Sequence, residues 1–93
     1  MKEKILIDDN YYYDVVRRNI KKYRIISGLT HQELADLTCL TRDYICDIES
    51  LKKNKGFSLA TLGRIAYALD IDIRNLFDND VEEKTKKGEE TLI

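Results

Sequence analysis

The sequence predicts an all-helical fold in a single compact domain. Apolar residues recur at three- and four-residue steps in several segments, which is the spacing of one face of an α-helix. Ser, Thr and Asp stand directly before these segments, where their side chains can cap helix N-termini. The chain has 93 residues, no proline and four glycines, which argues against long loops and β-sandwich folds. A domain of this length buries only about two-thirds of its unfolded surface, so it depends on tight helix packing.

The first expected helix covers about residues 12–27. A polar residue, Asp9 or Asn10, precedes it as an N-cap, and Gly28 follows it as a residue that readily takes positive φ. The expected inward stripe consists of Tyr12, Val16, Ile20, Tyr23 and either Ile26 or Ser27.

The second and third expected helices are short and close together. Thr30 caps the second, and Glu33 three residues later completes a capping box. Its inward residues are expected to be Leu34, Ala35 and Thr38. Thr41 caps the third helix, about residues 41–50, whose buried stripe is Ile45 and Ile48.

Two further helices complete a compact five-helix bundle. Residues 51–57 form a lysine-rich loop, after which Ser58 caps the fourth helix and Asp72 caps a short fifth helix. The fourth helix is expected to bury Leu59, Leu62, Ile65, Ala66 and Leu69, and the fifth Ile73, Leu76 and Phe77. We expect residues 1–10 to form an N-terminal arm, 11–78 the domain, and the charged residues 79–93 a disordered tail.

Composition excludes several classes of protein. No apolar run approaches the length of about 20 residues that spans a bilayer. The apolar stretch within residues 1–7 is too short for a secretory signal. We therefore expect a cytoplasmic protein without a membrane partner, with Cys39 and Cys46 as reduced thiols. One histidine and two cysteines make a zinc site improbable, and no catalytic constellation or phosphate-binding glycine loop is present, so neither an enzyme nor a cofactor is expected.

The charge is unevenly distributed, although the net charge is only −1. Residues 15–57 contain nine Lys or Arg and five acids, a local charge of +4, whereas the rest of the chain carries −5. A local positive region suits a surface that faces phosphates, although a solvated helix surface explains the same charge.

The second and third helices have the arrangement of a helix-turn-helix, in which the second helix of the motif lies in the DNA major groove. A short turn near Cys39 and Leu40 separates them. Because Ile45 and Ile48 must face the core, the other side chains of the third helix are left on its remaining faces: Arg42, Asp43, Tyr44, Cys46 and Asp47.

Residues 15–78 resemble the phage-repressor type (Cro/repressor-like) of helix-turn-helix regulators. The matching segments are 28–35 (GLTHQELA), 40–45 (LTRDYI), 47–49 (DIE), 58–62 (SLATL), 66–69 (AYAL) and 75–77 (NLF). The resemblance implies five helices and binding to double-stranded operator DNA, often as a homodimer.

The resemblance also implies roles for individual residues. It places base-reading side chains at Arg42, Asp43 and Asp47, and backbone contacts at Tyr44, Lys52, Lys53 and Asn54. His31 stands where the family usually has a glutamine that contacts the DNA backbone. Arg24 and Glu49 match a structural ion pair between helices. The full predicted DNA-binding set is His31, Gln32, Thr41, Arg42, Asp43, Tyr44, Cys46, Asp47, Lys52, Lys53, Asn54 and Lys55.

Some of these roles stay open. Arg42 can read a guanine or hold a phosphate, and Asp43 can accept from cytosine N4 or pair locally with Arg42. Cys39 occupies a turn position where the family commonly has glycine, so either a left-handed cysteine costs about 1–2 kcal/mol or the turn differs.

The predicted function is sequence-specific DNA binding by a transcriptional regulator, with a repressor favoured. The alternative is a protein-interaction module, such as an antitoxin or adaptor, that uses the same helices. Of Ile25 and Ile26 only one is expected to face the core, which leaves the other for a partner surface.

Overall fold

The computed structural model describes residues 8–78, and these residues form an all-helical domain. It contains four α-helices, α1 (Tyr11–Ile26), α2 (His31–Thr38), α3 (Arg42–Glu49) and α4 (Leu59–Leu69), followed by the 3-10 helix η1 (Ile73–Phe77). The all-helical prediction is confirmed, but the fifth expected α-helix is a five-residue 3-10 helix. The expected arm and tail lie outside the described residues, except that residues 8–10 lead into α1.

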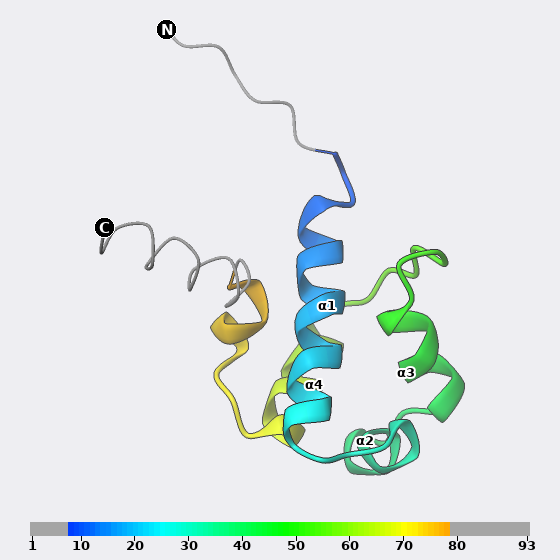
Figure 1. Ribbon diagram of the computed structural model, residues 1–93, viewed down its shortest axis with the longest axis vertical. Helices are drawn as coiled ribbons and strands as arrows, with labels where there is room; N and C mark the ends of the chain where they lie inside the picture. The colour runs from blue at the N-terminus through cyan, green and yellow to red at the C-terminus, as the bar shows by residue number, and fades with distance from the viewer. Residues whose placement is uncertain (1–7, 79–93) are drawn as a thin grey trace, which may run out of the picture.

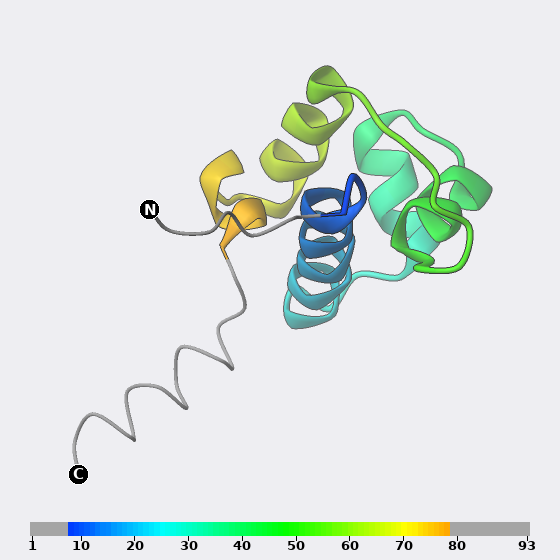
Figure 2. The ribbon, with the colours of Figure 1, turned by 90° about the horizontal axis from the view of Figure 1, so that it is seen from above.

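Helix α1 is the centre of the domain. Seen from above in Figure 2, it has α3 and α2 on one side and α4 and η1 on the other. It contacts α3, α4 and η1, while α2 packs against α3 and α4 (Figure 1). None of the described helices is long and apolar enough to cross a membrane.

Four helix starts are capped as predicted. The N–H of Glu33 donates to Thr30 Oγ1 at 3.0 Å, and Glu33 Oε1 accepts from the Thr30 N–H at 2.9 Å. Thr41, Ser58 and Asp72 accept backbone N–H groups in the same way. Asn10 precedes α1 without making a side-chain cap. Each cap satisfies N–H groups that the first turn of a helix leaves without a partner.

The ends of α1, α2 and α4 share one geometry. Gly28, Cys39 and Asp70 have φ of 75°, 62° and 60°. In each case the next residue donates its N–H to the carbonyl five residues back, at 3.0–3.1 Å. This pattern closes a helix with a left-handed residue, which glycine adopts without strain. Cys39 therefore takes the left-handed turn, at a conformational cost of about 1–2 kcal/mol.

The core lies between α1 and the other elements. Its fully buried members include Ile20, Leu34, Ile45, Ile48, Ile65 and Leu76, all expected from the sequence. Tyr12, Leu59 and Phe77 were expected inside, but they are 56%, 70% and 42% exposed. They stand at or near the ends of their elements and line a shallow apolar hollow of about 210 Å³ that stays open to solvent.

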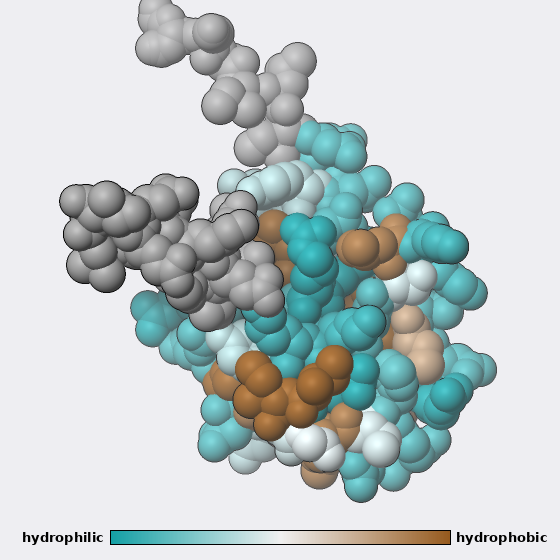
Figure 3. Space-filling view, viewed as in Figure 1, coloured by the Kyte–Doolittle hydropathy of each residue, from teal (hydrophilic) through white to brown (hydrophobic). Residues whose placement is uncertain are grey.

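The C-terminal end of α1 exposes two apolar residues. Ile25 and Ile26 are 57% and 70% exposed, so the expectation that one of them faces the core is wrong. Arg24 occupies the inward position of this last turn, and the chain turns away at Gly28. Figure 3 shows an apolar patch over the region where α1 ends.

Candidate nucleic-acid interface

Helix α3 presents one face to the core and the other to solvent. The turn of residues 39–41 joins it to α2, and Thr41 Oγ1 accepts the Tyr44 N–H at 3.1 Å, which fixes where the helix begins. Ile45 and Ile48 are fully buried against the core. The opposite face is therefore held rigidly from behind, as a DNA-reading helix requires.

The N-terminal end of α3 carries its most accessible polar side chains. The side chains of Arg42 and Asp43 are 56% and 92% exposed, and that of Asp47 is 28% exposed. Arg42 Nη1 lies 3.6 Å from Asp43 Oδ1, a surface ion pair that contributes little to stability. Tyr44 and Cys46 are half-buried. Because Arg42 and Asp43 are exposed, this end of the helix is open to a ligand.

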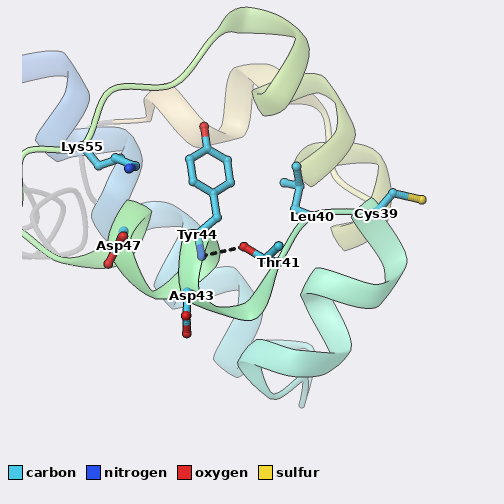
Figure 4. A pocket seen from close by; sticks show the side chains of 7 residues that line it. All are labelled: Cys39, Leu40, Thr41, Asp43, Tyr44, Asp47 and Lys55. Carbon is cyan, nitrogen blue, oxygen red and sulfur yellow. Dashed lines mark hydrogen bonds between the residues drawn. The ribbon is translucent and has the colours of Figure 1, made fainter.

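A shallow hollow of about 460 Å³ runs along α3. It is lined by Cys39, Leu40, Thr41, Asp43, Tyr44, Asp47 and Lys55 (Figure 4). The Tyr44 ring stands between Thr41 and Lys55, and Asp43 points to the opposite side of the helix from Tyr44. The hollow thus joins the turn, the third helix and the following loop in one surface. Cys39 and Leu40 were not predicted as part of it.

The lysine-rich loop folds back toward α3. Lys53 Nζ lies 3.3 Å from Asp47 Oδ1, and Lys55 Nζ lies 5.8 Å from the centre of the Tyr44 ring. Residues 51–56 are all exposed, including Lys52 and Asn54, which has a positive φ of 52°. The predicted loop cations and the predicted helix residues are therefore neighbours in space.

The start of α2 meets the end of α3 through an ion cluster. Arg24 donates from Nε and Nη2 to the two carboxylate oxygens of Glu49, at 2.7 and 3.0 Å. His31 Nε2 lies 3.1 Å from the same Glu49 Oε1. The hydrogen bonds that Arg24 donates to Glu49 raise the pKa of Arg24 above its ordinary value. The Arg24–Glu49 pair that the resemblance implies is present, and it orients His31.

Gln32, another predicted site residue, makes its hydrogen bond away from this surface. Its Nε2 donates to Asp36 Oδ1 at 2.8 Å, along the exposed side of α2. Both cysteine thiols are free. Among residues 8–78 no three His, Cys, Asp or Glu side chains are placed to hold a metal ion.

Arg17 is buried, although it counts toward the positive charge of residues 15–57. Its residue exposure is 0%, and its Nη1 donates to the carbonyls of Ile48 and Lys55. It therefore adds nothing to a phosphate-facing surface, and Arg24 is likewise engaged internally. Its position was available from spacing, because residues 17, 20 and 24 follow one helical stripe that includes buried Ile20.

Comparison with known proteins identifies relatives of the chain. It is 32% identical over 63 residues to control protein C.SmaI of Serratia marcescens, covering 68% of this chain and 73% of that protein. The crystal structure of the restriction-modification controller protein C.AhdI from Aeromonas hydrophila is 31% identical. It superposes with a TM-score of 0.64, over 70% of this chain and 96% of that one. An HTH_3 family transcriptional regulator from Vibrio cholerae is 26% identical with a TM-score of 0.70, over 78% of this chain and 40% of that one. No family model matches the chain.

The fold, the exposed α3 face and these relatives define the class: a DNA-binding helix-turn-helix transcriptional regulator. The chain belongs to the phage-repressor-type helix-turn-helix family, as the sequence resemblance indicated. Within that family it is similar to the control proteins from Serratia marcescens and Aeromonas hydrophila. Its structural neighbours named above are described as a controller protein and a transcriptional regulator.

Proposed function

We propose that this protein is a sequence-specific regulator, acting as a repressor, that inserts α3 into the major groove of double-stranded DNA. The observation that carries the proposal is that α3 has two distinct faces. Arg42 and Asp43 are exposed on one face, and Ile45 and Ile48 anchor the opposite face in the core. An exposed lysine loop next to that helix supplies the charge that phosphates need.

Each group of residues has a distinct task in this proposal. Arg42 and Asp43 reach base edges, with the guanidinium suited to guanine and the carboxylate to cytosine N4. Asp47 follows one turn later, beside Cys46, whose thiol suits the methyl group of thymine. Thr41, Tyr44 and the loop from Lys52 to Lys55 contact the backbone.

The N-terminal end of α2 supplies the remaining backbone contacts. His31 is held through Nε2 by Glu49, so its other ring nitrogen is the one free to face a phosphate oxygen. Gln32 follows it in the exposed first turn. Helix N-termini favour phosphate oxygens because their N–H groups lack partners within the helix.

The protein is proposed to bind as a homodimer in the cytoplasm. One copy offers a single short reading helix, which contacts few base pairs. Two copies on a two-fold operator, with half-sites about one helical turn apart, bury enough DNA surface for useful affinity.

The test is a salt-titrated gel shift with duplexes selected from a random library. Affinity should fall steeply as salt rises, in proportion to the phosphates contacted. Arg42→Ala should relax the preference at one base position, and Lys53→Ala should weaken all duplexes alike and reduce the salt slope by about 1. Arg74→Ala, on η1 and 87% exposed at its side chain, is the matched control and should change neither.

A protein-interaction module is the second candidate, and the exposed Ile25 and Ile26 favour it. Large apolar residues that lie together on a surface are typical of partner contacts. If Arg42→Ala and Lys53→Ala left the affinity for every duplex unchanged, the DNA-reading proposal would fail. Loss of a partner complex in the Ile25→Ser/Ile26→Ser variant would then support this candidate.

A further inference from the structure

We propose that Arg17 is a positioning residue that holds the lysine loop in the shape needed to contact phosphates. This inference rests on the proposed DNA-binding function of the loop. Arg17 Nη1 donates to the carbonyl of Ile48 at 3.1 Å and to that of Lys55 at 2.7 Å. These carbonyls stand at the two ends of the segment that carries the loop lysines, so a single nitrogen closes the loop.

The surroundings of Arg17 are built around its guanidinium. Its Nε donates to Asp14 Oδ1 at 3.1 Å, and the rings of Tyr13 and Phe57 lie 5.9 and 5.5 Å from its central carbon. The two rings also contact each other edge-on, with centres 5.0 Å apart. The two ends of the loop are therefore held by a guanidinium that α1 supplies, between the Tyr13 ring of α1 and the Phe57 ring that follows the loop.

Stability alone is a poor explanation for this arrangement. Arg17 Nη2 is buried without a hydrogen-bond partner, and the Asp14 side chain is 32% exposed, so the charge is only partly compensated. Apolar residues of similar volume often replace buried ion pairs without loss of stability. What an apolar side chain cannot do is bind two carbonyls and so fix the loop.

The other contacts of the loop cannot perform this task while DNA is bound. Lys53 contacts Asp47 and Lys55 contacts the Tyr44 ring through the same ammonium groups that phosphates would take. Both contacts are given up when those groups turn to the DNA. The Arg17 bonds use backbone carbonyls and persist, so the loop stays ordered before and after binding. A preordered loop avoids the cost of ordering its backbone on association.

Two substitutions separate positioning from packing. Arg17→Lys keeps the positive charge, but its ammonium ends one bond short of the Nη1 position and lysine has no separate Nε donor. It therefore cannot hold Asp14 and both carbonyls at once, and Arg17→Met keeps only the apolar volume. Asn19→Ala is the matched control: Asn19 is also buried on α1 and binds two carbonyls, of Leu76 and Asp78, both at 2.8 Å, but at η1. All variants are made in the full chain.

The first measurement is amide hydrogen exchange of residues 50–56 without DNA. Both Arg17 variants should exchange faster there, and Asn19→Ala should not. The second is duplex affinity against salt, with a duplex selected from random sequence. Arg17→Lys should bind roughly tenfold more weakly, the cost of fixing the backbone of about one loop residue on binding. Its salt slope should be shallower by about 1–2 as phosphate contacts are lost.

The decisive measurement is a double-mutant cycle with Lys53→Ala. This substitution should cost less affinity in the Arg17→Lys background than in the unaltered protein, whereas its cost should be unchanged in the Asn19→Ala background. Equal costs in all three backgrounds, with an unchanged salt slope, would overturn the inference.

Failure of the proposed function has a different signature. If the unaltered protein bound no duplex, the proposed function and the role of Arg17 in it would both fail. Faster exchange in the loop of the Arg17 variants would still show that Arg17 orders the loop. If loop exchange were unchanged in Arg17→Lys, the ordering of the loop by Arg17 would itself be refuted. Should the Arg17 variants not fold, Asp14→Ala removes the Nε acceptor at a partly exposed residue and should give the same changes at smaller amplitude.

Discussion

Removal of Arg24 should destabilise this fold severely, because it leaves a buried carboxylate without its main partner. The side chains of Arg24 and Glu49 are 9% and 5% exposed, and His31, at 34%, is the remaining neighbour of that carboxylate. Breaking one side of a buried pair costs about 3–5 kcal/mol. Domains are stable by only about 5–15 kcal/mol. Arg24→Met should therefore lower the melting temperature by roughly 10–40 °C.

Two companion variants identify the cause. Glu49→Gln should cost less, about 1–3 kcal/mol, because its amide oxygen still accepts from Arg24. The double variant Arg24→Met/Glu49→Met removes both charges and should recover most of the loss. The assay is urea unfolding followed by circular dichroism at one fixed protein concentration, since association shifts apparent stability. A cost below about 1 kcal/mol for Arg24→Met would refute the reasoning about burial.

Three further predictions concern helix ends and pH. Cys39→Gly should stabilise the protein by about 0.5–1 kcal/mol, because glycine takes the left-handed conformation without strain. Gly28→Ala should destabilise it by about 1 kcal/mol for the converse reason. Melting curves in which both variants shift the melting temperature in the same direction would contradict this. Thr41→Ala should cost about 1 kcal/mol through loss of the cap of α3, and urea unfolding that shows no change would count against that cap. The hydrogen bond from Arg74 lowers the pKa of Asp72 to about 2, so its contribution to stability is present above about pH 4 and is lost as the pH falls toward 2; an NMR titration of the Asp72 carboxyl with an ordinary midpoint would contradict it.

The sequence predicts local features of this fold well. The caps at Thr30, Thr41, Ser58 and Asp72 each depend on a side chain and an N–H two or three residues away, so the information lies within one turn. The helix-turn-helix followed in the same way from two caps and a short turn. The assignment of DNA contacts to individual residues stays a prediction.

Features that depend on distant segments could not be predicted. Leu59 and Phe77 fit a helical stripe, but burial depends on which elements cover the ends of α4 and η1. The spacing of residues 17, 20 and 24 places Arg17 on the inward stripe, but its acceptors at Ile48 and Lys55 lie 31 and 38 residues away and could not be predicted. One of Ile25 and Ile26 was expected to face the core. Helical spacing does not reveal that Arg24 takes the inward position of that turn.

The two buried arginines of α1 both reach the C-terminal end of α3, one at the Ile48 carbonyl and the other at Glu49. The opposite end, at Arg42 and Asp43, has side chains that project into solvent. Replacement of those two residues should therefore leave the scaffold intact. A library randomised there could be screened for new target sequences without co-selecting for folding, and natural relatives could diverge in their targets by the same route.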